Sequence, residues 1–171
     1  MKTRTTDRLL QYLLTGALAV LAVVIWDATR NKVVGVNDTA PEFSVTAASG
    51  KTVSRSSFGG KLLVLNFWAS WCGPCVQEMP TLEALHEAGK DRGLVLLGIS
   101  VDKNEKSYRR FLERHKPGFL TAHDPEQRIN DSYGTYRYPE TYVIDASGSV
   151  LLKKIGVLDQ ETVKQILGML G

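Results

Sequence analysis

Residues 61–80 read KLLVLNFWASWCGPCVQEMP, and this stretch decides the expected fold. Its first eight residues form a nearly continuous apolar run rich in β-formers, which predicts a strand buried on both faces of a sheet. A helix is expected to follow from Cys72 to about Gly89, because apolar residues recur there at a spacing of three. Pro80 lies inside this helix and removes one backbone hydrogen bond, which predicts a kink.

The two cysteines of this 171-residue chain are separated by only two residues. A disulfide stabilises a fold most when it closes a long loop, so a bridge between Cys72 and Cys75 is poorly placed as a structural staple. The start of a helix offers unpaired N–H groups and the positive end of the helix dipole, which stabilise a thiolate. We therefore predict a redox pair in which Cys72 attacks a partner disulfide and Cys75 resolves the mixed disulfide. Pro74 suits the first helical turn, where its missing N–H is not needed.

A zinc site and inert core cysteines are the alternatives for this pair. Structural zinc takes four ligands, and the three histidines, His86, His115 and His123, show no paired spacing. We therefore expect no metal, and no cofactor other than the Cys72–Cys75 disulfide itself. The net charge of +3 comes without a cluster of basic and aromatic residues, so we expect no nucleic-acid partner.

Residues 9–26 read LLQYLLTGALAVLAVVIW and carry no charge. As a helix they would span about 27 Å, close to the hydrocarbon thickness of a bilayer. We expect an uncleaved transmembrane anchor here, with residues 1–8 as its N-terminal flank and residues 27–39 as a linker. A cleaved signal peptide and a buried core helix are the alternatives.

The cations that flank this segment indicate its orientation. Lys2, Arg4 and Arg8 precede it, whereas Arg30 and Lys32 follow it. Because cytoplasmic flanks are enriched in Lys and Arg, this bias favours a cytoplasmic N-terminus. The domain at residues 40–171 would then face the periplasm or the cell exterior from the cytoplasmic (inner) membrane.

The rest of the domain alternates between strand and helix patterns. We expect a hairpin near 43–53, strands at 94–101, 119–121, 141–144 and 150–155, and helices at 105–115, 126–133 and 160–170. Strands separated by helices predict parallel pairing, and the late hairpin adds antiparallel strands. The expected fold class is α/β, with a central mixed sheet and helices on both faces.

The motif from Trp68 to Cys75, WASWCGPC, resembles the thioredoxin signature WAxWCGPC. Together with the N-terminal hairpin, an insert at about 101–125 and the apolar segment, it resembles the TlpA/ResA/CcmG branch of the thioredoxin family. The resemblance covers about residues 41–170. It implies a thioredoxin-like three-layer sandwich with an extra N-terminal hairpin and a central insert, working as a membrane-anchored thiol–disulfide oxidoreductase.

The resemblance also implies which residues contact a substrate. Tyr138 and Pro139 stand where the family has a cis-proline loop facing the dithiol, and the backbone of Tyr138 would pair with a substrate segment. Trp71, Gly73 and Pro74 of the motif would contribute the remaining contacts. A strand-start proline with a trans bond is the alternative for Pro139.

Three further residues set this chain apart from cytosolic thioredoxins. Asn66 replaces the buried aspartate that handles the proton of the second cysteine, and an amide cannot titrate. Glu78 matches a glutamate of the branch, and we predict that it exchanges a proton with Cys75. The alternative is an acid that merely balances the helix dipole. Glu140, shared with CcmG-like proteins, is interpreted as shaping acidic recognition near the site.

The implied reaction is reduction of protein disulfides in an oxidising compartment, because Gly-Pro between the cysteines resembles the reducing members. Electrons would come from a CcdA/DsbD-type membrane donor. The expected partner is a disulfide-bonded protein, with apocytochrome c during cytochrome c maturation first and copper-centre assembly or another substrate next. We expect a monomer.

Two alternatives come from other functional classes. A thiol peroxidase needs the pattern Pro-x-x-x-Thr-x-x-Cys, and here Ala69 stands at the place of the threonine. A redox-inert binding module would often lose a cysteine, whereas this chain keeps both.

Overall fold

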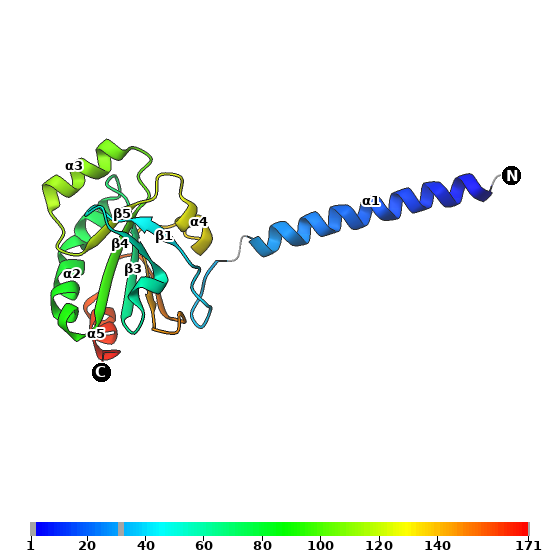
Figure 1. Ribbon diagram of the computed structural model, residues 1–171. Coiled ribbons are helices and arrows are strands. Elements are labelled where there is room, and N and C mark those ends of the chain that lie inside the picture. The colour runs from blue at the N-terminus through cyan, green and yellow to red at the C-terminus, as the bar shows by residue number, and fades with distance from the viewer. Residues whose placement is uncertain (1–2, 31–32, 171) are drawn as a thin grey trace. The chain divides into compact units, whose positions relative to one another are not determined.

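The computed structural model describes residues 3–30 and 33–170. The chain divides into two units, Met1–Lys32 and Val33–Gly171. The first unit is a single helix, α1 (Thr3–Arg30), shown in blue in Figure 1. Lys2 and Lys32, two of the cations used to orient the predicted anchor, lie outside the described residues, as does Gly171.

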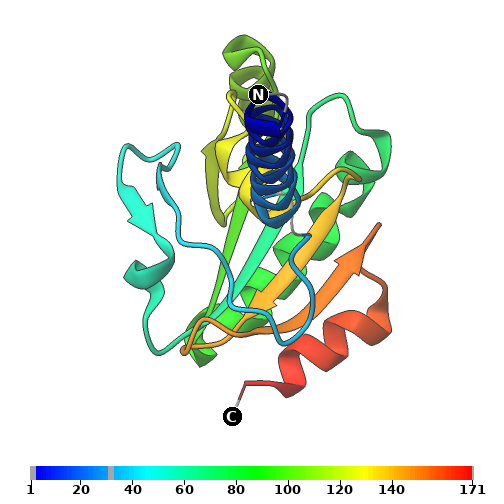
Figure 2. The same cartoon turned by 90° about the vertical axis from the view of Figure 1, so that its right-hand side faces the viewer.

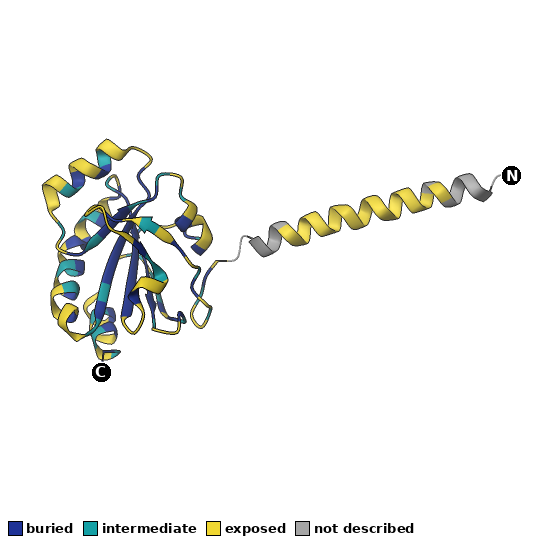
Figure 3. Cartoon of the chain, in the orientation of Figure 1, coloured by how far each residue is buried: buried dark blue, intermediate teal, exposed yellow. Residues whose placement is uncertain are grey.

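Helix α1 carries mostly apolar side chains in its middle part. Between Leu10 and Trp26, all side chains that the structure describes are exposed (Figure 3). Nevertheless, within residues 3–30 and 33–170 we find no helix with both the length and the apolar character that crossing a membrane requires. The structure therefore does not confirm the transmembrane anchor predicted at residues 9–26.

The second unit is built on a five-stranded sheet in the order β5-β4-β3-β6-β7. Its strands are β3 (Leu62–Trp68), β4 (Leu94–Ser100), β5 (Leu120–His123), β6 (Glu140–Ile144) and β7 (Val150–Ile155). The pairs β3–β4 and β4–β5 are parallel, whereas β3–β6 and β6–β7 are antiparallel. The predicted mixed sheet is confirmed, and β3 at its centre is buried at every residue, as its apolar run requires (Figure 3).

Helices cover both faces of this sheet (Figure 1). They are α2 (Gly73–Gly89), α3 (Glu105–His115), α4 (Arg128–Tyr133) and α5 (Gln160–Gly168), with short 3-10 helices η1 (Arg55–Phe58) and η2 (Lys90–Arg92). Successive side chains of a strand point to opposite faces. The Trp68 ring lies 4.5 Å from Phe111 on α3, and the Phe67 ring lies 5.4 Å from Tyr133 on α4, between ring centroids. Helices α3 and α4 therefore pack on opposite faces, as the three-layer prediction requires.

The close approach of β4 to Trp68 depends on a glycine. A Cβ added at Gly98 would lie 2.9 Å from Nε1 of Trp68 and 3.2 Å from the Phe119 ring. A larger residue here would displace Trp68 from its place against α3. The end of β3, where the dithiol motif begins, is thus held by tight packing.

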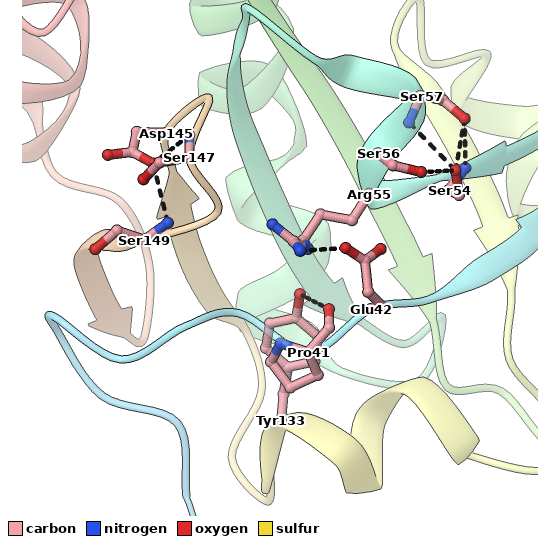
Figure 4. Close-up of polar contacts among 10 residues, drawn as sticks. All are labelled: Pro41, Glu42, Ser54, Arg55, Ser56, Ser57, Tyr133, Asp145, Ser147 and Ser149. Carbon is pink, nitrogen blue, oxygen red and sulfur yellow. Dashed lines mark hydrogen bonds and ion pairs between the residues drawn. The ribbon is translucent and has the colours of Figure 1, made fainter.

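The predicted N-terminal hairpin forms from β1 (Ser44–Thr46) and β2 (Thr52–Ser54). It joins the free edge of β5, where the Ala48 N–H donates to the Thr121 carbonyl oxygen over 2.8 Å. Figure 2 shows this hairpin in cyan at one edge of the unit, with β7 and α5 at the other. Figure 4 shows an ion pair between Arg55 and Glu42, and a hydrogen bond of 3.1 Å that the Tyr133 hydroxyl donates to the Pro41 carbonyl. These contacts hold the segments that precede β1 and follow β2.

The linker predicted at residues 27–39 ends earlier than expected. Val34 is buried, its N–H donates to the Tyr133 carbonyl over 3.1 Å, and its own carbonyl accepts from Nζ of Lys153 over 2.8 Å. The folded unit therefore begins at Val33 rather than at residue 40. Hydrogen bonds to residues far away in the sequence leave no periodic pattern of apolar residues in a short polar segment. The sequence therefore did not indicate this boundary.

Candidate active site

The dithiol lies at the start of α2, where the sequence predicts it. Cys72 is the N-cap residue of the helix, and Cys72 and Cys75 form a disulfide with their Cα atoms 5.2 Å apart. Cys75 is fully buried, whereas Cys72 keeps 6% of its surface exposed. Cys72 is therefore the cysteine nearer to the surface, while Cys75 faces the protein interior.

The backbone around Cys72 favours its thiolate form. The N–H of Cys75 donates to Sγ of Cys72 over 3.2 Å, which is one of the otherwise unpaired donors at the helix start. A sulfur at this position also lies at the positive end of the helix dipole, which lowers the pKa of a thiol. Burial has the opposite effect on Cys75, since an apolar environment disfavours a charged sulfur. The geometry thus places the two sulfurs in unequal surroundings.

The predicted substrate contacts come together beside the dithiol. The Tyr138–Pro139 peptide bond is cis, as expected. Trp71 is 68% exposed, and its ring meets the Tyr138 ring edge-on at a centroid distance of 6.0 Å. Gly73 and Pro74 form the exposed first turn of α2. These two loops, far apart in the sequence, therefore form one surface next to Cys72.

Tyr138 is held in this position by α4. Its hydroxyl donates to Oδ1 of Asn130 over 2.8 Å, and Nδ2 of Asn130 donates to the Thr135 carbonyl over 3.0 Å. Asn130 is itself buried. Its side chain therefore fixes the aromatic ring that accompanies Trp71.

Glu78 is fully buried, on α2 one turn beyond Cys75. The N–H of Leu158 donates to its Oε1 over 2.6 Å, and Nδ2 of Asn66 donates to its Oε2 over 3.1 Å. Burial raises the pKa of Glu78 from 4.5 to about 7, although both hydrogen bonds act in the opposite direction. Glu78 is therefore a carboxyl group that can gain or lose a proton near neutral pH.

Asn66 connects Glu78 with the strand that follows Pro139. Its Nδ2 also donates to Oγ1 of Thr141 over 2.9 Å. Its Oδ1 is buried and accepts no hydrogen bond from any described residue. Asn66 therefore links the Glu78 carboxyl group to β6.

The interpretation of Glu140 as a source of acidic recognition is wrong. Glu140 is fully buried, and its Oε1 lies 2.9 Å from Nζ of Lys153 and accepts a 2.5 Å hydrogen bond from the Tyr142 hydroxyl. Its charge is neutralised inside the domain rather than presented to a partner. Burial, and then this hydrogen bond, raise the pKa of Tyr142. Glu140 therefore anchors β6 to β7.

Sequence reasoning missed Asp102, which lies directly after β4. Its buried carboxylate accepts from the Ser70 N–H over 2.9 Å, from the Ser70 hydroxyl over 2.8 Å and from the Ser100 hydroxyl over 2.8 Å. Ser70 belongs to the dithiol motif, so Asp102 holds the loop between β3 and α2. The sequence feature that could have indicated Asp102 is an acidic residue near the carboxyl end of a strand expected to be buried.

The candidate metal ligands do not form a site. Within residues 3–30 and 33–170, no group of three or more His, Cys, Asp or Glu side chains is placed to hold a metal ion. His123 instead stacks on the Tyr108 ring at a centroid distance of 4.7 Å.

Comparison with known proteins adds an independent observation. A family model described as the AhpC/TSA family matches residues 36–153. The chain belongs to the AhpC/TSA family. Thiol-disulfide oxidoreductase ResA of Bacillus thuringiensis (strain Al Hakam) is 30% identical over 158 residues, which cover 92% of this chain and 89% of that protein. Thioredoxin-like protein YneN of Bacillus subtilis (strain 168) is 33% identical over 150 residues, covering 85% and 87%.

Solved structures agree with these relatives. A crystal structure assigned to thiol:disulfide interchange protein DsbE of Chlorobium tepidum superposes with a TM-score of 0.76 at 31% identity, covering 81% of this chain and 99% of that one. The thioredoxin-like fold and the resemblance to the ResA and CcmG group are therefore confirmed. This AhpC/TSA member is a thiol–disulfide oxidoreductase of the ResA/DsbE type.

The raised pKa of Glu78 predicts a specific pH dependence of stability. Between pH 4.5 and about 7 the folded protein holds a proton that the unfolded chain has lost, so the free energy of unfolding should fall as pH rises through this window. The shift corresponds to roughly 3 kcal/mol. Glu78→Gln cannot ionise and should lack this loss. Urea unfolding of the oxidised protein, in which neither cysteine titrates, measures the difference.

Glu87→Gln is the matched control, because Glu87 is an exposed acid on the same helix. Its curve should follow that of the parent protein. Parallel curves for Glu78→Gln and the parent would show that Glu78 is ionised throughout this range.

Proposed function

We propose that this oxidoreductase reduces disulfides of partner proteins outside the cytoplasm. The observation that carries the proposal is the asymmetric dithiol, in which Cys72 at the start of α2 keeps 6% of its surface exposed and Cys75 behind it is fully buried. The exposed Trp71 and the Tyr138–Pro139 loop beside Cys72 supply a surface for an extended partner segment.

The reaction proceeds in two exchanges. The Cys72 thiolate attacks one sulfur of the partner disulfide, forming a mixed disulfide and releasing the other partner sulfur as a thiolate. The Cys75 thiol then loses its proton and attacks Sγ of Cys72. This step forms the Cys72–Cys75 disulfide and releases the second partner sulfur, which takes up a proton. Two electrons pass from the protein to the partner.

Glu78 is proposed as the base that receives the proton of Cys75. Residues three apart on a helix are neighbours on one face, so Glu78 lies next to Cys75 inside the domain. Its pKa of about 7 suits exchange with a thiol at neutral pH. Asn66 cannot titrate, and its hydrogen bond to Oε2 orients the Glu78 carboxylate.

The direction of reaction and the partners are part of the proposal. Gly73-Pro74 between the cysteines resembles the sequence of reducing members, so the disulfide formed in each cycle must be reduced again. We propose a CcdA/DsbD-type membrane protein as electron donor. The proposed substrate is the pair of haem-attachment cysteines in apocytochrome c. Copper-centre assembly is the alternative substrate class.

Helix α1 is proposed to attach the domain to a membrane. Its exposed apolar side chains, from Leu10 to Trp26, would otherwise remain in contact with water. The match to ResA covers 92% of the chain and must therefore include part of α1. More cations precede the apolar segment than follow it, which favours a cytoplasmic N-terminus. This orientation supports export of the domain.

A thiol peroxidase is less well supported. The position that needs a threonine hydroxyl in that class is held by Ala69, which is fully buried and offers no donor. The expected result is therefore slow peroxide consumption by this protein.

Cys75→Ser should trap the physiological partner. Without the resolving thiol, the mixed disulfide on Cys72 persists and can be isolated from cells and identified. Cys72→Ser should trap nothing and should lose insulin reduction, because the nucleophile is absent. Insulin reduction that survives Cys72→Ser would refute the assignment of Cys72.

Glu78→Gln should slow the second exchange specifically. With a chromogenic aromatic disulfide as substrate, attack by Cys72 releases the first coloured thiolate and attack by Cys75 releases the second. In the parent protein the second rate should rise with pH through about 7, as Glu78 becomes the base. Glu78→Gln should remove this rise with pH and slow the release of the second coloured thiolate by about ten-fold or more. An unchanged pH profile, equal to that of Glu87→Gln, would exclude Glu78 as the base.

Membrane attachment is tested by fractionation. The full chain should stay with membranes after an alkaline wash, whereas the unit Val33–Gly171 should remain in the supernatant and keep its disulfide exchange activity. A phosphatase reporter that is active only outside the cytoplasm, fused after Gly171, should be active. Recovery of the full chain in the supernatant would refute attachment by α1.

A further inference from the structure

Helix α3 carries different charges on two of its faces. Glu105 and Glu113, its two acids, line a groove beside the N-terminal hairpin together with Arg109. Nη2 of Arg109 lies 2.6 Å from Oε1 of Glu105, and Glu113 adds a second negative charge, so this face is acidic on balance. Arg110 and Arg114, one turn apart, lie on another face. That face carries positive charge only.

Arg110 and Arg114 line a small pocket that adjoins the dithiol loop. Ser107, Phe111 and Ser70 complete its lining, and its volume is about 210 Å³. Ser70 precedes Cys72 by two residues, so their Cα atoms lie within about 7 Å of each other. The pocket is smaller than the roughly 300–1,000 Å³ of small-molecule sites, and it suits one side chain of a bound protein.

The two guanidinium groups are not neutralised by any residue that the structure describes. Both are exposed, and among the described residues no carboxylate lies in ion-pair contact with either of them. Asp102, the acid closest in this loop, is buried and accepts hydrogen bonds from Ser70 and Ser100 instead. Asp102 therefore fixes the Ser70 wall of the pocket without occupying the arginines.

We propose that the pocket formed by Arg110, Arg114 and Ser70 binds an aspartate or glutamate side chain of the disulfide-bonded partner. This inference rests on the proposed function and specifies its substrate class. Guanidinium groups form paired hydrogen bonds with carboxylates, and two of them on one face attract an acidic segment before contact. The distance from Ser70 to Cys72 places the acid within about three residues of the partner's reactive cysteine.

Synthetic peptides with one internal disulfide test this recognition. Three peptides carry Glu, Gln or Lys at two and three residues from a cysteine and are otherwise identical. The measured quantity is the second-order rate constant for oxidation of the reduced full chain in a single turnover. The parent protein should react about five-fold faster with the Glu peptide than with the Gln peptide, and slowest with the Lys peptide. This preference should vanish near 0.5 M salt, where charges are screened.

The double variant Arg110→Gln/Arg114→Gln should react at equal rates with the Glu and Gln peptides. Arg109→Gln is the matched control, because Arg109 is paired with Glu105 and does not line the pocket, and it should keep the preference. Because each preference is a ratio within one variant, a loss of folded protein does not imitate the expected result.

The outcomes separate this inference from the proposed function. Fast reduction of both peptides without a preference for Glu, or a preference that survives the double variant, would overturn the pocket alone. Loss of the preference in Arg109→Gln as well would show a general charge effect and also overturn it. A parent protein that reduces none of the peptides would refute the proposed reductase function together with the pocket.

Discussion

Strand β3 is buried between helices on both faces, and the position of every group at the dithiol depends on that burial. Its last two residues place aromatic rings on opposite faces, with Phe67 against α4 and Trp68 against α3. Burying each ring contributes about 2–3 kcal/mol. The strand end therefore has one position, and the loop that leaves it can present Cys72 at the start of α2 in one orientation.

Buried polar groups also hold the residues around the dithiol in place. Asp102 binds the Ser70 backbone and hydroxyl, so the loop before the dithiol is fixed from the β4 side. Asn66 and the Leu158 N–H hold Glu78 behind Cys75. Burying a carboxyl group disfavours its charged form and so raises its pKa. Glu78 can therefore exchange a proton near pH 7. The same burial that stabilises β3 thus tunes the chemistry at α2.

Local patterns accounted for most of the fold. The apolar runs of β3 and β4, the helix after Cys72 and the late hairpin depend on residues close together in the chain, which is why periodicity predicted them. The role of Glu140 was predicted incorrectly, and the folded unit begins at Val33, before the boundary expected at residue 40. Both depend on residues far away in sequence, since Val34 contacts Tyr133 and Lys153, and Glu140 is paired with Lys153.

The sequence by itself determined the reaction class, because two cysteines with two residues between them at a helix start are a purely local arrangement. It also indicated Glu78 through a resemblance. Only the tertiary structure decided the raised pKa of Glu78, which results from its burial and is opposed by the hydrogen bond from Leu158, 80 residues away. It also decided the neutralisation of Glu140. It alone brought Arg110 and Arg114 to Ser70. The physical reason is that burial and charge pairing are set by neighbours in space, whereas sequence spacing reports neighbours along the chain.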